Sequence, residues 1–182
     1  MAETGEILAV LAVLAVLAAV RVWNYKGPAR LQPLVNPIAA AVLILMSGPA
    51  GYLKTTKTAW LYAVTGAVVI AVILAVAARF AGPERTDAHP VRKALLEIPF
   101  AVVVFEETAF RGVLTALVGP YLSALAFGLW HVRSGKWAVL FTAGAGLILG
   151  WGGAASGSLL VPFAWHWAAN GFGVLLFQAP KP

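Results

Sequence analysis

The sequence contains seven apolar runs, most of them close to the length that a helix needs to cross a lipid bilayer. A hydrocarbon core about 30 Å thick takes about 20 helical residues. Long Leu, Ala and Val runs without strict alternation favour helices over barrel strands, and a helix satisfies its own backbone in lipid. We therefore expect an all-α, polytopic transmembrane helix bundle of about seven spans, integral to the cell membrane. The runs occupy about residues 5–22, 35–53, 58–78, 94–118, 120–131, 137–151 and 158–178.

The balance of residue types excludes a soluble globule, because hydrophobic residues make up 61% of the chain and charged residues only 11%. The net charge of +6 lies mainly in short loops, so membrane orientation explains it better than nucleic-acid binding. The sequence has no cysteine, which excludes disulfides, thiolate metal sites and a cysteine nucleophile. Glu3 and Glu6 precede the first apolar run without a basic residue, which indicates a retained span rather than a secretory signal.

Positively charged residues fall unevenly on the two sides of the predicted bundle. With seven spans, ten basic residues share one side, and only Lys54 and Lys57 lie on the other. Because cytoplasmic loops are rich in Lys and Arg, this asymmetry predicts an N-terminus outside the cell and a cytoplasmic C-terminus. The ten residues are Arg21, Lys26, Arg30, Arg79, Arg85, Arg92, Lys93, Arg133, Lys136 and Lys181.

The one long polar linker, residues 79–93, follows the third predicted span. We interpret residues 1–182 as a single transmembrane domain. Within it, residues 1–93 form three N-terminal spans and the polar loop, and residues 94–182 form the core spans that carry any chemistry.

Three ionisable residues lie within the fourth predicted span: Glu106, Glu107 and Arg111. Each such group costs about 2.5 to 3.5 kcal/mol inside a membrane, so it indicates a partner, a cavity or a function. Arg111 follows Glu107 by four residues, which places the two on one helical face as an ion pair. Adjacent residues of an α-helix diverge by about 100°, so we expect Glu106 to face elsewhere.

The next two polar positions come from the short fifth run and the last run. His131 ends the sequence PheGlyLeuTrpHis, with Phe127 one turn earlier to pack against it. Because Arg133 follows at once, we expect a water-filled cavity that opens on the cytoplasmic side. His166 and Asn170 lie four residues apart on one helical face of the last run.

Carboxylate, imidazole and amide groups on three separate helices indicate one hydrated pocket. A carboxylate suits a general base, an imidazole can relay the proton, and His166 with the Asn170 amide could stabilise an oxyanion. The sequence lacks the HExxH motif of zinc proteases, and Asp87, its only aspartate, lies in a loop. The stretch at 154–157 differs from a rhomboid serine motif at Ala154 and fits a turn better.

Three ordered motifs resemble a known family. The sequence carries GluGluThrAlaPheArg at 106–111, Phe127 with His131, and His166 with Asn170. These resemble the EExxxR, FxxxH and HxxxN motifs of the CAAX-protease and bacteriocin-processing family, also called the Abi family of intramembrane glutamate proteases. The resemblance covers roughly residues 94–178.

The resemblance implies an intramembrane endopeptidase that hydrolyses a peptide bond of a membrane-associated or C-terminally lipidated protein. Glu106 would be the base, and His131 its partner on the attacking water. His166 and Asn170 would stabilise the oxyanion, and Glu107, Arg111 and Phe127 would support the site.

Two alternatives remain open at this point. Glu106, His131 and His166 could hold zinc, since two histidines and a carboxylate form a common catalytic zinc set. The chain could instead be a non-enzymatic scaffold or bacteriocin-immunity protein that binds a partner peptide. We expect membrane lipid and a peptide or protein substrate as partners, no nucleic acid and no cofactor. The sequence does not determine the oligomeric state.

Overall fold

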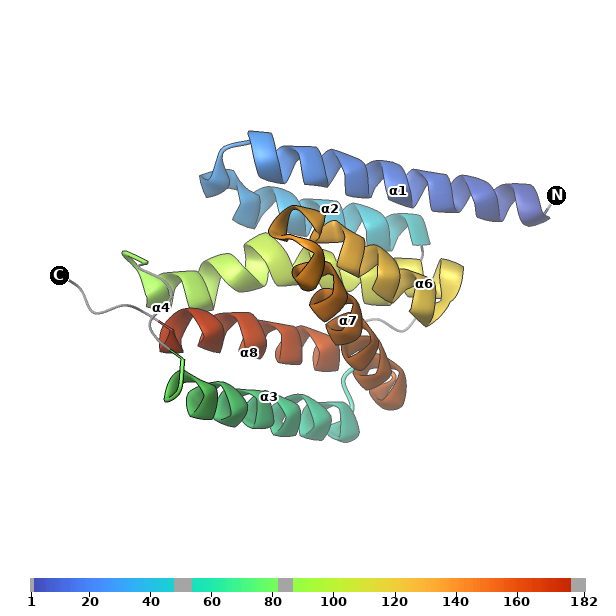
Figure 1. Ribbon diagram of the computed structural model, residues 1–182. Coiled ribbons are helices and arrows are strands. Elements are labelled where there is room, and N and C mark those ends of the chain that lie inside the picture. The colour runs from blue at the N-terminus through green and yellow to red at the C-terminus, as the bar shows by residue number, and fades with distance from the viewer. Residues whose placement is uncertain (1, 48–53, 82–86, 178–182) are drawn as a thin grey trace.

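The computed structural model describes residues 2–47, 54–81 and 87–177 (Figure 1). All regular secondary structure in these ranges is helical, which confirms the all-α prediction. The helices are α1 (Ala2–Lys26), η1 (Ala29–Leu31), α2 (Gln32–Ser47), α3 (Lys57–Ala78), α4 (Pro90–Arg92), η2 (Lys93–Val103), α5 (Val104–Glu106), η3 (Glu107–Leu114), α6 (Thr115–Trp130), η4 (Val132–Ser134), α7 (Lys136–Ser156) and α8 (Leu160–Leu176). The predicted span ends at 48–53 and 178, and also Arg85 and Lys181, lie outside the described residues.

By length and composition, five of these helical stretches can cross a membrane: Ile7–Lys26, Ala29–Met46, Lys57–Ala78, Pro90–Trp130 and Lys136–Ser156. Helix α8, with 17 residues, is just shorter than the 18 required for this set. Large apolar side chains such as Leu45, Ile73 and Phe141 are more than half exposed, which suits a lipid-facing exterior. The chain is an integral membrane protein. Seven spans, and the orientation of the termini, stay predictions.

The stretch Pro90–Trp130 is a helical hairpin. Gly119 has φ 81° and ψ 167°, a conformation that favours glycine, and Pro120 follows it. The chain reverses there, as two contacts across the hairpin show. Ser123 Oγ donates to the Phe110 carbonyl at 2.5 Å, and the rings of Phe110 and Phe127 lie 5.2 Å apart. We call residues 90–118 the central helix and residues 120–130 the return helix. The break falls between the two predicted segments 94–118 and 120–131.

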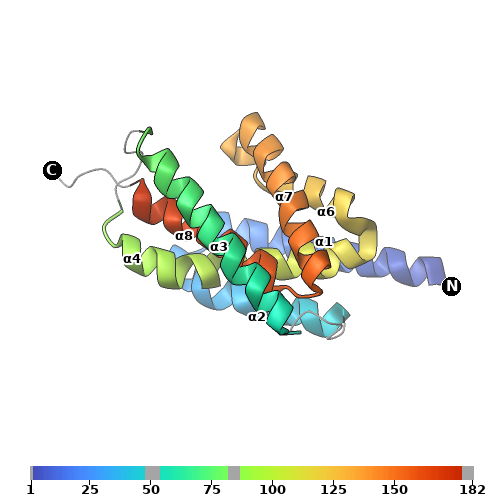
Figure 2. The ribbon, with the colours of Figure 1, turned by 90° about the horizontal axis from the view of Figure 1, so that it is seen from below.

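Figure 1 shows the central helix between α2 above and α8 below, with α1 beyond α2 and α3 beyond α8. Helix α7 crosses this row and packs on α6 and α8, as the second view also shows (Figure 2). The residues buried around the central helix are mostly apolar and come from α1, α2 and the return helix, among them Val13, Leu43 and Phe127. The central helix therefore has the most enclosed position.

Two segments of the central helix, η2 and η3, are π-helical, with hydrogen bonds from residue i to residue i+5. The amide of Val104 bonds to the Pro99 carbonyl, and the amide of Thr115 bonds to the Phe110 carbonyl. On α2, Asn36 is fully buried and donates its side-chain amide to the Ala101 carbonyl. A wider turn and a buried polar anchor thus set the rotation of the helix just before Glu106.

Candidate active site

The two glutamates of the central helix are buried, with exposed fractions of 7% for Glu106 and 2% for Glu107. Arg111 Nη1 donates to Glu107 Oε1 at 3.1 Å, at the four-residue spacing that predicts this ion pair. Both side chains of the pair are nearly inaccessible, so each charge depends on the other for compensation.

His166 from α8 meets both carboxylates. Its Nδ1 lies 2.6 Å from Glu107 Oε1, and its Nε2 lies 3.9 Å from Glu106 Oε2. The sequence-based expectation that Glu106 faces away from Glu107 is therefore wrong. The π-helical turn that begins at Glu107 rotates successive residues by less than an α-helix does, and both side chains are long enough to converge. One imidazole thus connects the two acids.

Phe127 of the return helix joins His131 to this group. Its ring lies 4.9 Å from the His131 ring and 5.9 Å from the His166 ring, both edge to face, and the Arg111 guanidinium lies 3.9 Å from its centroid. His131 Nδ1 is 2.9 Å from the Phe127 carbonyl. Because a carbonyl only accepts, Nδ1 carries the hydrogen, and Nε2 of the neutral ring keeps its lone pair.

Among the described residues, neither His131 nor Asn170 makes a hydrogen bond or ion pair with the two acids. Within the described residues, no hydrogen bond or ion pair joins His131 to Glu106 or His166, and the two histidines are connected through the Phe127 ring. Asn170 lies one turn after His166 on α8 and is half-buried. These contacts bring together Glu106, Glu107, Arg111, Phe127, His131 and His166, and Asn170 follows one turn later on α8.

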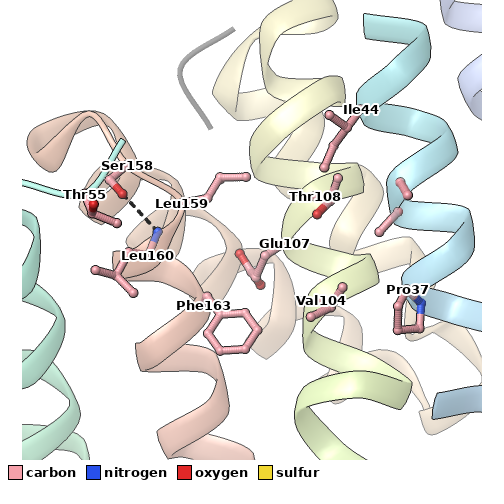
Figure 3. Close-up of a pocket in the computed structure, with 12 residues that line it drawn as sticks. Pro37, Ile44, Thr55, Val104, Glu107, Thr108, Ser158, Leu159, Leu160 and Phe163 are labelled. Carbon is pink, nitrogen blue, oxygen red and sulfur yellow. Dashed lines mark hydrogen bonds between the residues drawn. The ribbon is translucent and has the colours of Figure 1, made fainter. Parts of the chain in front are cut away.

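A cavity of about 380 Å³ reaches Glu107. Its walls come from α2, from the central helix and from the start of α8, and Figure 3 shows Glu107 extending from the central helix toward α8. Ser158 lines this cavity, whereas Arg133 lies at the opposite end of α7, about 30 Å away along that helix. The cavity therefore approaches the acids from the end opposite to the one that the sequence predicts.

A second cavity, of about 550 Å³, lies between α3, α8 and the start of the central helix. Its lining is apolar and aromatic, and it shares Leu160 and Phe163 with the first cavity. The two cavities therefore adjoin at the start of α8.

Comparison with known proteins bears on the segment that holds this site. Residues 92–172 match the family model described as type II CAAX prenyl endopeptidase Rce1-like. This segment belongs to the CAAX-protease family. The match includes all seven motif residues from Glu106 to Asn170 and confirms the resemblance that the three motifs indicate. Searches of curated proteins and of solved structures gave no match.

The CAAX-protease segment contains a site contact that sequence reasoning missed. Trp130, the residue before His131, donates its indole N–H to Glu106 Oε1 at 2.8 Å. A partly buried indole needs an acceptor, and an acid 24 residues away in a neighbouring helix was available. That need was the only signal in the sequence, and it does not identify which acceptor the indole binds.

Two further indoles fix α8 on either side of His166. Trp165 Nε1 donates to the Tyr62 carbonyl of α3 at 2.9 Å, and Trp167 Nε1 donates to the Ala94 carbonyl at 2.7 Å. In an i to i+5 ladder the Ala94 carbonyl would bond to the amide of residue 99, but Pro99 has no N–H. The Trp167 indole donates to the Ala94 carbonyl in place of that missing amide. Pro99 therefore creates the position at which α8, the helix that carries His166, attaches to the central helix.

The alternative zinc set, Glu106, His131 and His166, stays a prediction. No group of three or more His, Cys, Asp or Glu side chains within the described ranges is arranged to hold a metal ion. His166 Nδ1 lies 2.6 Å from Glu107 Oε1, and the ring of His131 lies 4.9 Å from the Phe127 ring.

Proposed function

We propose that this chain is an intramembrane endopeptidase of the glutamate type. It hydrolyses a peptide bond of a membrane-associated or C-terminally lipidated substrate with water that Glu106 and His131 activate. The observation that carries the proposal is the convergence of Glu106 and Glu107 on His166 in the buried interior of the helix bundle. Membership in a protease family supports an enzyme over a scaffold or immunity protein.

Glu106 acts as the general base through Oε2. Trp130 occupies Oε1, whereas Oε2 has no hydrogen-bond partner among the described residues. Oε2 and His166 Nε2 are 3.9 Å apart, a spacing that one water at about 2.8 Å from each would bridge once it enters between these buried groups. His131, with its Nε2 lone pair, completes the set as the second proton acceptor.

His166 and Asn170 stabilise the oxyanion that forms as water attacks the carbonyl. Glu107 holds the Nδ1 side of the imidazole, and Arg111 compensates the charge of Glu107. In the doubly protonated ring, Nδ1–H donates to Glu107 and Nε2–H donates to the oxyanion. Asn170 adds its side-chain amide from one turn further along α8.

The substrate enters as an extended peptide beside Glu107, and its lipid lies in the adjoining apolar cavity. The first cavity supplies the route to the acids, and the second has the apolar lining that an isoprenoid or acyl chain requires. The predicted loops on one side of the membrane hold ten basic residues, and those on the other side hold two. This difference supports a cytoplasmic C-terminus in a seven-span protein of the cell membrane.

The test is peptide cleavage by purified protein in lipid nanodiscs, with a farnesylated fluorogenic peptide that ends in a CAAX sequence as the probe. We expect Glu106→Gln and His131→Ala to lower kcat by about 100- to 10,000-fold, the range for general acid–base groups. Glu97→Gln is the matched control, because Glu97 is an exposed acid on the same helix and pairs with the exposed Arg92. Parent-like kcat in both site variants would refute the assignment.

The scaffold and zinc alternatives predict different results in the same assay. A scaffold yields no cleavage by the parent protein and full peptide binding by Glu106→Gln. A zinc enzyme loses activity in a strong chelator and contains stoichiometric metal by elemental analysis. The proposed enzyme keeps its activity in the chelator.

A further inference from the structure

Within residues 2–47, 54–81 and 87–177, Trp130 alone donates a hydrogen bond to the Glu106 carboxylate. Its indole N–H reaches Glu106 Oε1 at 2.8 Å across the hairpin. An indole nitrogen donates and never accepts, so it cannot take a proton from this oxygen. The bond therefore fixes the orientation of the carboxylate and leaves Oε2, the other oxygen, toward His166 Nε2.

The Trp130 ring is itself held from several sides. Phe105 and Phe110 of the central helix lie with ring centroids 6.0 Å and 5.7 Å from it. From α1, the Arg21 guanidinium lies over the ring at 4.7 Å from its centroid. This is a cation–π contact, and a cation over an indole also draws electron density from the ring and strengthens its N–H as a donor.

Arg21 comes from a part of the chain that the family match leaves out. Helix α1 ends at Lys26, well before the matched segment begins at residue 92. Arg21 also lies over the ring of Tyr25, one turn later on α1, at 4.4 Å. The Arg21 guanidinium therefore contacts both the Tyr25 ring and the Trp130 ring, and these two contacts hold it in place.

We propose that Trp130 is a positioning residue that selects which oxygen of Glu106 acts as the base, and that Arg21 of α1 clamps Trp130 in this role. The proposal rests on the assignment of Glu106 as the general base. Neither residue touches the substrate; both act through the Glu106 carboxylate. Helix α1 thereby contributes to the reaction without belonging to the matched core.

The expected effect is on turnover rather than on substrate binding. Losing a hydrogen bond to a charged group changes a rate by about 10- to 100-fold when the bond matters at the transition state. We expect Trp130→Phe, which keeps a ring but loses the N–H, to lower kcat by this factor with KM unchanged. Arg21→Gln should give a smaller loss, and Arg21→Lys, which keeps the cation, should recover part of it.

The matched control is Trp137→Phe. Trp137 is an exposed tryptophan with its own cation contact from Lys136, and among the described residues it makes no hydrogen bond to a glutamate. It should leave kcat and KM as in the parent. All variants are assayed in nanodiscs with the farnesylated CAAX peptide.

A second readout does not depend on activity. The indole N–H signals are recorded in ¹H–¹⁵N spectra of the nanodisc-embedded protein. The signal of Trp130 is assigned as the one that disappears in Trp130→Phe. Glu106→Gln should shift that signal upfield, because an amide oxygen accepts more weakly than a carboxylate. Arg21→Gln should shift it as well, since the cation over the ring is gone.

The outcomes separate this inference from the proposed function. If Glu106→Gln is as active as the parent, Glu106 is not the base, and the positioning role of Trp130 is refuted with it. An inactive Glu106→Gln with parent-like kcat in Trp130→Phe overturns only the positioning role. The positioning role is also refuted if the Trp130 indole N–H has the same chemical shift in Glu106→Gln as in the parent. This chemical-shift measurement decides the positioning role if Trp130→Phe fails to fold.

Discussion

Arg111→Met tests the energetic basis of the site. The two charged ends of the Arg111–Glu107 pair are 3.1 Å apart, and the side chains are 3% and 2% exposed. Methionine keeps much of the length and volume of arginine but no charge, so Glu107 stays buried without its cation. Breaking a buried pair in this way costs about 3 to 5 kcal/mol. That loss is a large part of the 5 to 15 kcal/mol typical of whole-protein stability.

The assay is unfolding of the purified protein in mixed micelles by titration with a denaturing detergent, followed by tryptophan fluorescence. The double variant Arg111→Met with Glu107→Gln should recover part of the loss, because the glutamine removes the charge that Arg111→Met leaves without its partner. Arg92→Gln is the control, since its pair with Glu97 is exposed and contributes less than about 1 kcal/mol. An Arg111→Met protein within about 1 kcal/mol of the parent would refute the reasoning, as would a double variant no more stable than the single one.

Two further predictions concern how α8 is held. A Cβ at Gly66 would overlap the Trp165 indole, so Gly66→Ala should lower the unfolding temperature by several degrees, whereas Gly144→Ala, which meets open space, should not. An unchanged melting curve for Gly66→Ala contradicts the packing. Trp167→Phe leaves the Ala94 carbonyl without its side-chain donor and should cost about 1 kcal/mol. Adding Pro99→Ala should restore part of this, because residue 99 regains an amide for the helix ladder; a further loss in the double variant contradicts this account.

The sequence predicts the class of fold and the residues of the site for clear physical reasons. Long apolar runs leave helices in lipid as the simplest solution, and charged groups within such runs indicate function. The break between the central and return helices also follows from local chemistry. Gly119 takes a positive φ that other residues avoid, and Pro120 cannot continue the hydrogen-bond ladder before it.

The detailed arrangement of the site could not be predicted in the same way. The meeting of Glu106 and Glu107 at His166 depends on π-helical turns, and an α-helical periodicity gives the wrong angle between neighbouring side chains. The bond from Trp130 to Glu106 depends on the register of two antiparallel helices, which forms only in the folded hairpin. The contact of Arg21 with Trp130 depends on where α1 packs against the other helices. The low-complexity sequence of α1 does not indicate which of its residues face them.

The most direct test of the account is whether the protein forms new peptide ends with oxygen from water, and whether Glu106 is required. Parent and Glu106→Gln proteins in nanodiscs are incubated with membrane-anchored peptides in ¹⁸O-labelled water, and the products are analysed by mass spectrometry. The account predicts labelled new carboxyl ends with the parent and none above background with Glu106→Gln. Equal amounts of labelled ends from the two proteins would contradict it.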